Sequence, residues 1–152
     1  MPPPRKSLRR PSAASSAGAK RLSETRFYLD ESIYSRVLRD AMLAAGANVE
    51  HAGGAFPFGT TDEVWLTACG ERNWIVLTRD QRIRRRVLER EAIRQSAAAV
   101  FALTAGEATA AETGDVVVRL LVKFANMAVS EPKPFLYTFG LTGRVSRVRL
   151  DR

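Results

Sequence analysis

The chain has 152 residues, of which 45% are hydrophobic and 26% charged, and its formal net charge is +8. This composition is typical of a globular domain with a core of its own, and no run of about 18 apolar residues predicts a membrane-spanning helix. Cys69 and His51 are the single cysteine and the single histidine, which excludes an internal disulfide and a Cys/His zinc cluster. We therefore expect a cytoplasmic protein without a secretory signal or a membrane partner.

The positive charge is concentrated at the start of the chain. Residues 1–26 contain seven Lys or Arg and one acid, whereas residues 27–152 contain 17 basic and 15 acidic residues. Residues 1–25 are also rich in Pro, Ser, Ala and Arg and poor in large apolar side chains, so we expect a disordered basic leader there and one folded domain over 26–152. The leader could contact nucleic-acid phosphates, or it could simply be a solvated extension.

Short apolar runs alternate with amphipathic segments in the first half of the domain. The expected elements, in chain order, are a strand at 27–30, a helix at 32–45, a strand at 48–51, a helix at 61–71 and a strand at 74–78. Ser32 is a suitable N-cap for the first of these helices. Thr60 and Glu63 have the spacing of a capping box for the second.

The second half continues the alternation and then changes. We expect an Arg-rich helix at 83–95, a strand at 98–103, a helix at 104–127 opened by a Thr104/Glu107 capping box, and a hairpin formed by 134–139 and 144–150. Strands that alternate with helices predict parallel βαβ units. The expected fold class is therefore α/β, a three-layer α/β/α domain with a mainly parallel sheet and a C-terminal hairpin.

Three acids are expected at one edge of this sheet. Asp30 ends the first strand, Asp80 follows the third, and Asp62 opens a helix that starts at the same edge. Ligands of open parallel sheets bind beyond the carboxyl ends of the strands, so these carboxylates would converge if the first and third strands are neighbours. Like charges so close favour a bound cation, and carboxylate oxygens suit Mg²⁺ or Mn²⁺. Glu31 is either a further ligand or a solvated neighbour.

Such a site would serve phosphodiester hydrolysis, with Asp30, Asp62 and Asp80 as catalytic, metal-binding residues. Asp62 also has a simpler explanation, because acids are favoured in the first turn of any helix. Asp80 could merely start the following helix.

Residues near these acids are candidates for substrate binding. Thr78 and Arg79 precede Asp80, and Arg82 and Arg86 begin a stripe of arginines with a spacing of four that continues through Arg90 and Arg94. On a helix this stripe could guide an RNA backbone, or it could be an ordinary solvated face.

The glycine-flanked loop before Asp62 contains two aromatic residues. Phe56 and Phe58 could stack on a base, or they could close an edge of the core. Trp65 and Trp74 are expected to pack in the interior.

Asp30 at a strand end, followed by "TDEVWLTACGERNWIVLTRD" (Thr61–Asp80), resembles the PIN-like nuclease family, and more narrowly its compact VapC-type toxins of toxin–antitoxin pairs. The likeness covers about 27–103, and "VFALTAGEATAAE" and "KPF" further on are similar too. It implies a Mg- or Mn-dependent endoribonuclease that cleaves RNA, often as a homodimer and often bound by an antitoxin protein. Larger PIN domains supply another acid, for which this chain offers Glu31, Glu50 or Glu63. The alternative function is a non-catalytic PIN-like module that binds RNA or a protein partner.

Overall fold

The computed structural model describes residues 16–79 and 87–150. Its strands are β1 (Arg26–Leu29), β2 (Asn48–His51), β3 (Trp74–Thr78), β4 (Ala99–Leu103), β5 (Phe135–Phe139) and β6 (Val145–Val148). Its described helices are α1 (Ser16–Ser23), α2 (Arg36–Ala44), α3 (Ala52–Ala55), α4 (Asp62–Glu71), α6 (Val87–Arg94) and α7 (Ala110–Ser130). None of these helices combines the length and the apolar character needed to cross a bilayer.

The strands form one six-stranded sheet in the order β2-β1-β3-β4-β5-β6. The first five strands of this order are parallel, and β6 pairs antiparallel with β5 through a hairpin. The chain moves from β1 outward to β2 and then returns to the other side of β1 for β3, so the order reverses at the β1/β3 boundary. A reversal of this kind is where open parallel sheets bind their ligands.

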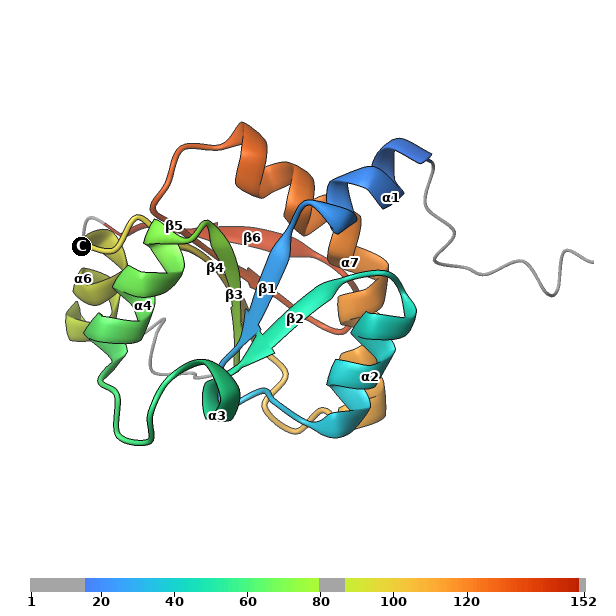
Figure 1. Ribbon diagram of the computed structural model, residues 1–152, viewed down its shortest axis with the longest axis horizontal. Coiled ribbons are helices and arrows are strands. Elements are labelled where there is room, and N and C mark those ends of the chain that lie inside the picture. Colours follow the sequence, from blue (N-terminus) through green and yellow to red (C-terminus); the bar gives the residue numbers. More distant parts are fainter. Residues whose placement is uncertain (1–15, 80–86, 151–152) are drawn as a thin grey trace, which may run out of the picture.

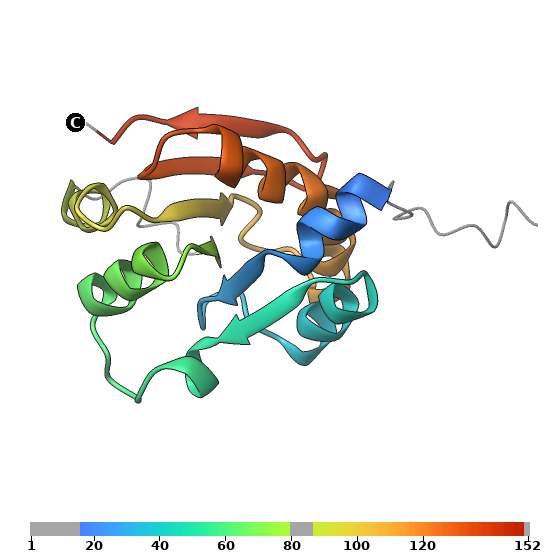
Figure 2. The ribbon, with the colours of Figure 1, turned by 45° about the horizontal axis from the view of Figure 1, so that its top comes forward.

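Helices cover both faces of the sheet, as Figures 1 and 2 show. Side chains alternate between the two faces of a strand, so Phe27 and Leu29 join the core beneath α2 and α7, while Tyr28 joins the core beneath α4 and α6. The parallel sheet, the three layers and the C-terminal hairpin are confirmed. In Figure 1 the carboxyl ends of β1 and β2 point to the lower edge of the molecule, where α3 and the loop to α4 also lie.

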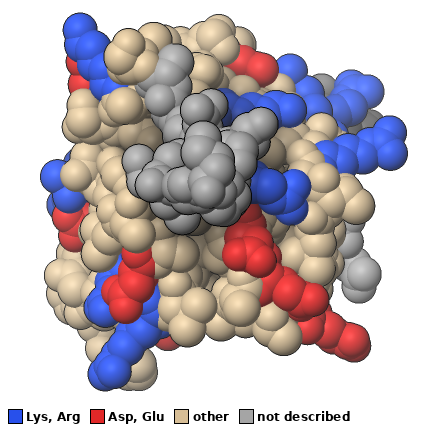
Figure 3. All heavy atoms as spheres, turned by 90° about the vertical axis from the view of Figure 1, so that its right-hand side faces the viewer, with Lys and Arg blue, Asp and Glu red and all other residues tan. Residues whose placement is uncertain are grey.

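The surface of the folded body carries both signs of charge. On the face seen in Figure 3, Lys and Arg gather toward the upper right, while Asp and Glu run from the centre to the lower right. This mixture agrees with the near balance of acids and bases in residues 27–152.

Helices α2 and α7 start several residues later than the sequence predicts. Ser35, not Ser32, caps α2, and its Oγ accepts a hydrogen bond from Leu38 N at 3.0 Å. The capping box of α7 is Thr109 with Glu112, because the predicted Thr104 donates its hydroxyl hydrogen to Phe139 O at the end of β5. In each case an earlier hydroxyl residue is held by a tertiary contact, so the next suitable residue caps the helix.

Helix α4 starts one residue later than the predicted capping box implies. Thr61 is its N-cap, and Thr60 Oγ1 donates to Pro57 O at 2.6 Å in the preceding turn. The predicted strands at 48–51 and 74–78 have the expected bounds.

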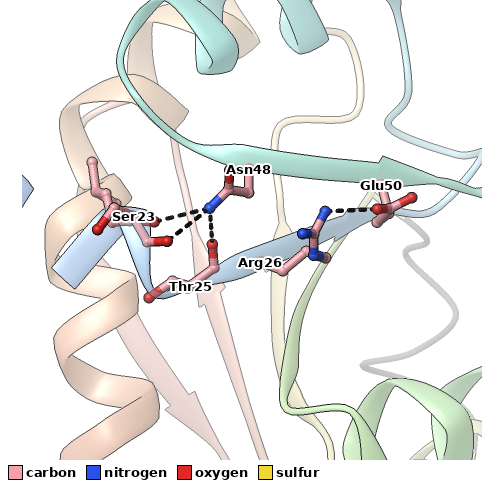
Figure 4. A network of polar contacts seen from close by, with 6 residues as sticks. Ser23, Thr25, Arg26, Asn48 and Glu50 are labelled. Atoms are coloured by element: carbon pink, nitrogen blue, oxygen red, sulfur yellow. Dashed lines mark hydrogen bonds and ion pairs between the residues drawn. The ribbon is translucent and has the colours of Figure 1, made fainter. Parts of the chain in front are cut away.

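The prediction of a leader that is disordered through residue 25 is wrong for residues 16–23. They form α1, and Leu22 is buried in the core beside α7. Asn48 fixes the end of this segment, because its Nδ2 donates to Ser23 O and Thr25 O, both at 3.1 Å (Figure 4). Residues 1–15 lie outside the described part of the chain, and the domain boundary at residue 25 stays a prediction.

A close approach between α4 and the turn after α6 generates a stability prediction. A Cβ added at Gly70 would lie 1.9 Å from Ser96 O, a backbone atom that cannot move independently. We expect Gly70→Ala to lower the free energy of unfolding by about 2 kcal/mol, as overpacking does. Urea unfolding followed by circular dichroism measures this change.

Gly114→Ala is the matched control. Its added Cβ would lie 3.5 Å from Ala41 Cβ, an ordinary contact, and removing a glycine from the interior of α7 stabilises a helix by up to about 1 kcal/mol. Equal changes in the two variants would show that the approach at Ser96 is not restrictive.

Candidate active site

The first predicted acid lies between two neighbouring strands. Leu29 of β1 pairs with Leu77 of β3, and Asp30 N continues the ladder by donating to Leu77 O at 3.1 Å. The Asp30 side chain meets the end of β3, where Oδ2 accepts a hydrogen bond from Thr78 Oγ1 at 2.8 Å. Thr78 is fully buried, so its hydroxyl is a fixed donor rather than a mobile surface group.

Ser32 completes the support of Asp30. Its Oγ donates to the same Oδ2 atom at 2.7 Å and accepts from Arg79 N at 2.9 Å. The turn that carries Ser32 is closed by Ile33 N and Tyr34 N, which both donate to Asp30 O at 3.0 Å. Ser32 thus links the turn after β1 to the end of β3, a role that its prediction as a helix cap missed.

Asp30 and Asp62 share one cleft, as the sequence predicts for two of the three acids. The cleft has a volume of about 370 Å³ and lies between the end of β1, the α3–α4 loop and the start of α4. Glu31 also lines it. Asp62 Oδ1 accepts a hydrogen bond from Trp65 Nε1 at 3.0 Å, which orients this carboxylate from within its own helix.

The pKa of Tyr28 is raised partly by the negative charge of the cleft. It lines the cleft and is 1% exposed. Burial raises the pKa of its hydroxyl strongly, and the negative charges of Asp30, Glu31 and Asp62 raise this pKa further. The hydroxyl therefore stays protonated, and no Lys, Arg or His from the described residues lines the cleft to offset the carboxylates.

The remaining predicted ligands are placed differently. Asp80, Arg82 and Arg86 lie outside the described residues. Glu50 forms an ion pair with Arg26, at 2.7 Å between Oε2 and Nη1, on the β2 side of the sheet (Figure 4). Among the residues that the structure describes, no three His, Cys, Asp or Glu side chains are grouped closely enough to hold one metal ion.

Arg79 contacts the opposite layer rather than the cleft. Its Nη1 donates to Ala108 O at 3.1 Å, and its Nη2 donates to Thr113 Oγ1 at 2.9 Å. These bonds attach the end of β3 to the first turn of α7. The guanidinium therefore supports the loop around Asp30, whereas the sequence predicts it beside a substrate phosphate.

The two loop phenylalanines differ. Phe56 is half-buried and meets the Tyr28 ring edge-on, with 5.4 Å between centroids, whereas Phe58 is fully exposed on the rim of the cleft. Trp65 is buried and Trp74 half-buried, and both pack near Tyr28, as expected.

These features define a class of protein: a parallel α/β domain with carboxylates at the β1/β3 switch point. The family model described as "PIN like domain" matches residues 25–105, more than half of the chain, and the chain belongs to the PIN-like domain family. The matched segment contains Asp30, Asp62 and Asp80, and the resemblance inferred from the sequence is confirmed.

A particular relative is known by name. The chain is 28% identical over 103 residues, which are 68% of this chain and 74% of the relative, to a Mycobacterium tuberculosis protein named "Putative ribonuclease VapC45". No solved structure shows significant similarity to the chain.

The support of Asp30 generates a second stability prediction. Thr78→Val keeps the shape of the side chain but removes the donor to the carboxylate, and hydrogen bonds to charged groups contribute about 1.5 kcal/mol or more. We expect a loss of about 1.5 kcal/mol in the free energy of unfolding, measured by urea denaturation at pH 7.

Thr138→Val provides the comparison. Thr138 is also a buried strand residue, but its hydroxyl makes a longer bond of 3.5 Å to the neutral Ser146 O. We expect its loss to be less than about 1 kcal/mol. A Thr78 variant as stable as this control would contradict the assigned role.

Proposed function

We propose that this protein is a divalent-metal-dependent endoribonuclease of the VapC type, which hydrolyses RNA phosphodiesters as the toxin of a toxin–antitoxin pair. The observation that carries the proposal is the Asp30 carboxylate, which two hydroxyls hold in place beside a cleft that it shares with Asp62 and Glu31. Membership in the PIN-like family and the name of the mycobacterial relative support the same reaction.

The chemistry of the cleft suits a hard divalent cation such as Mg²⁺ or Mn²⁺. Its carboxylate oxygens are the preferred ligands of these ions, and the described part of its lining offers no basic side chain to neutralise them. Both hydroxyl bonds to Asp30 go to Oδ2, so Oδ1 receives no hydrogen bond from the described residues. We propose Asp30, Asp62 and Asp80 as the ligands, with Glu31 as a further one.

Neighbouring side chains orient the two carboxylates of the cleft. Ser32 and Thr78 keep Asp30 in one orientation, and Trp65 does the same for Asp62. When bound, the cation would neutralise charge on the phosphoryl oxygens and lower the pKa of a coordinated water. Phosphoryl transfer depends mainly on positioning and on charge stabilisation, so the site needs no Ser, Cys or His nucleophile.

Substrate contacts are proposed for the residues after β3. Arg82 and Arg86 would bind RNA phosphates next to the acids. Thr78 and Arg79 would act by shaping the loop, since both of their side chains make bonds within the protein. An antitoxin partner, a homodimer and a cytoplasmic location belong to the same proposal and rest on the VapC-type relative.

A non-catalytic PIN-like module that binds RNA or a protein is the second candidate. It is favoured by one observation: the described residues alone do not assemble a metal cluster. The experiments below distinguish it from the nuclease.

Cleavage of RNA tests the catalytic role of the acids. We expect Asp30→Asn and Asp80→Asn each to reduce Mn²⁺-dependent cleavage of a fluorescent single-stranded RNA by at least about 100-fold, because each removes a charged ligand. Circular dichroism should show that both variants stay folded. Asp115→Asn, an exposed substitution on α7 away from the cleft, should cleave at the wild-type rate. Wild-type cleavage rates in both Asp30→Asn and Asp80→Asn would refute the nuclease.

Metal binding can be measured without activity. A ligand that binds only the folded state stabilises it by about 2.7 kcal/mol at 100 times its Kd. We expect MnCl₂ to raise the Tm of the wild-type protein and of Asp115→Asn, and to have much less effect on Asp30→Asn. A Tm that does not respond to manganese, together with intact RNA binding, would favour the module.

A further inference from the structure

Phe58 has an unusual environment for a large apolar side chain. Its relative exposure is 104%, whereas the other large apolar side chains exposed in the described residues reach 50–63%. Apolar side chains left wholly in water forgo the stabilisation that burial gives them. Phe58 also lines the cleft that contains the candidate catalytic residues Asp30 and Asp62.

The backbone beneath the ring is held on both sides. Thr60 closes a tight turn around Phe58, because its backbone N and its Oγ1 both donate to Pro57 O, at 3.1 and 2.6 Å. Gly59 has a φ of +89°, a left-handed conformation that this turn requires and that glycine adopts without strain. The turn therefore presents the Phe58 ring from a fixed point.

The residue before the turn acts as its anchor. Phe56 packs edge-on against Tyr28, and the Arg72 guanidinium lies 5.3 Å from the centroid of the Phe56 ring. Phe56 is thus half-buried and held by contacts within the protein, whereas the fully exposed Phe58 ring is the one available to a ligand.

We propose that Phe58 is a stacking platform for one unpaired nucleobase of a single-stranded RNA substrate. The inference rests on the proposed function for the identity of the ligand. Aromatic side chains bind splayed bases face to face, and a ring at the tip of a loop reaches bases that are not stacked in a duplex. The cleft of about 370 Å³ has the size of a small-ligand pocket and would accept one nucleotide between the ring and the carboxylates.

The surroundings of Phe58 favour a base over an apolar protein segment. Protein interfaces present a contiguous apolar core, whereas Phe58 is the fully exposed ring of this cleft, and the other rings that line it, Tyr28, Phe56 and Trp65, are buried or half-buried. Carboxylates line the same cleft, and a carboxylate oxygen that does not bind a cation can accept a hydrogen bond from an N–H group of a base. A flat ring and acceptor groups that line one cleft match the two recognition surfaces of a nucleobase, its face and its edge.

Equilibrium binding of RNA tests the platform. The probe is a fluorescein-labelled single-stranded RNA in EDTA, with the full-length protein and anisotropy as the readout. We expect Phe58→Ala to raise Kd by about tenfold, as loss of one stacked base does, and Phe58→Trp to stay within about twofold of wild type. Val129→Ala, an exposed apolar substitution on α7, is the matched control and should leave Kd unchanged. A duplex of the same sequence should bind the wild type and Phe58→Ala equally.

Steady-state cleavage in Mn²⁺ separates this inference from the proposed function. Phe58→Ala should raise KM by about the same factor as Kd and leave kcat within about twofold. If the wild type cleaves RNA while Phe58→Ala has wild-type Kd and KM, the platform is overturned and the nuclease stands. If the wild type does not cleave but Phe58→Ala still loses single-strand binding, the platform stands and the nuclease fails.

Two further outcomes would overturn the platform. One is a Phe58→Trp variant as weak as Phe58→Ala, because an aromatic face would then not be the feature that binds. The other is a Phe58→Ala variant that binds RNA normally but loses a protein partner. Thermal unfolding should be unchanged in Phe58→Ala, since the ring makes no interior packing contact to lose.

Discussion

The hydrogen bonds between Asp30 Oδ2 and the hydroxyls of Ser32 and Thr78 are the constraint on which the site depends. The bond from Thr78 can form because β1 and β3 are neighbours in register, which places the residue after Leu29 beside the end of β3, whereas the bond from Ser32 is local to the turn after β1. The orientation of this carboxylate therefore depends on the strand order that places β3 next to β1. A carboxylate fixed in this way is prepared for a ligand before the ligand arrives, and preorganisation of charged groups is the main contribution that proteins make to phosphoryl chemistry.

The alternation of side chains along β1 determines which layer contains the cleft. Phe27 and Leu29 turn toward α2 and α7, while Tyr28 turns toward α4 and lines the cleft together with Asp30. The layer on the α4 side is thin here, because α3 has four residues and is followed by a loop rather than by a second long helix. The cleft opens between this loop, the start of α4 and the end of β1, and the carboxylates of Asp30, Glu31 and Asp62 raise the pKa of the Tyr28 hydroxyl.

The strands and the fold class could be predicted from the sequence because a buried strand consists of consecutive apolar residues, as in "WIVLT". The presence of Asp30 and Asp62 in one cleft followed from the same reasoning, since parallel topology brings strand ends and helix starts to one edge. The misassigned residues are those with two competing partners. Ser32 and Thr104 could each cap a helix, but neither does. Ser32 bonds to Asp30 and to Arg79 N, and Thr104 bonds to Phe139 O. The Arg79 guanidinium could bind a phosphate, but in the structure it donates to Ala108 O and Thr113 Oγ1. These partners are brought to it by tertiary packing, which the residues around Arg79 in the sequence do not reveal.

The attachment of α1 has a geometric consequence for long ligands. Asn48 bonds to Ser23 and Thr25, just before β1, so α1 joins the sheet at the amino end of β1. Asp30 lies just after β1, at the opposite edge of the sheet. These two edges are separated by the length of a strand of four residues, on the order of 13 Å. Figure 1 shows α1 at the top of the molecule and the carboxyl ends of β1 and β2 near the bottom. A polyanion that contacted both Arg21 of α1 and the acidic edge would have to extend over the whole height of the sheet, which sets a minimum length on any molecule that binds both.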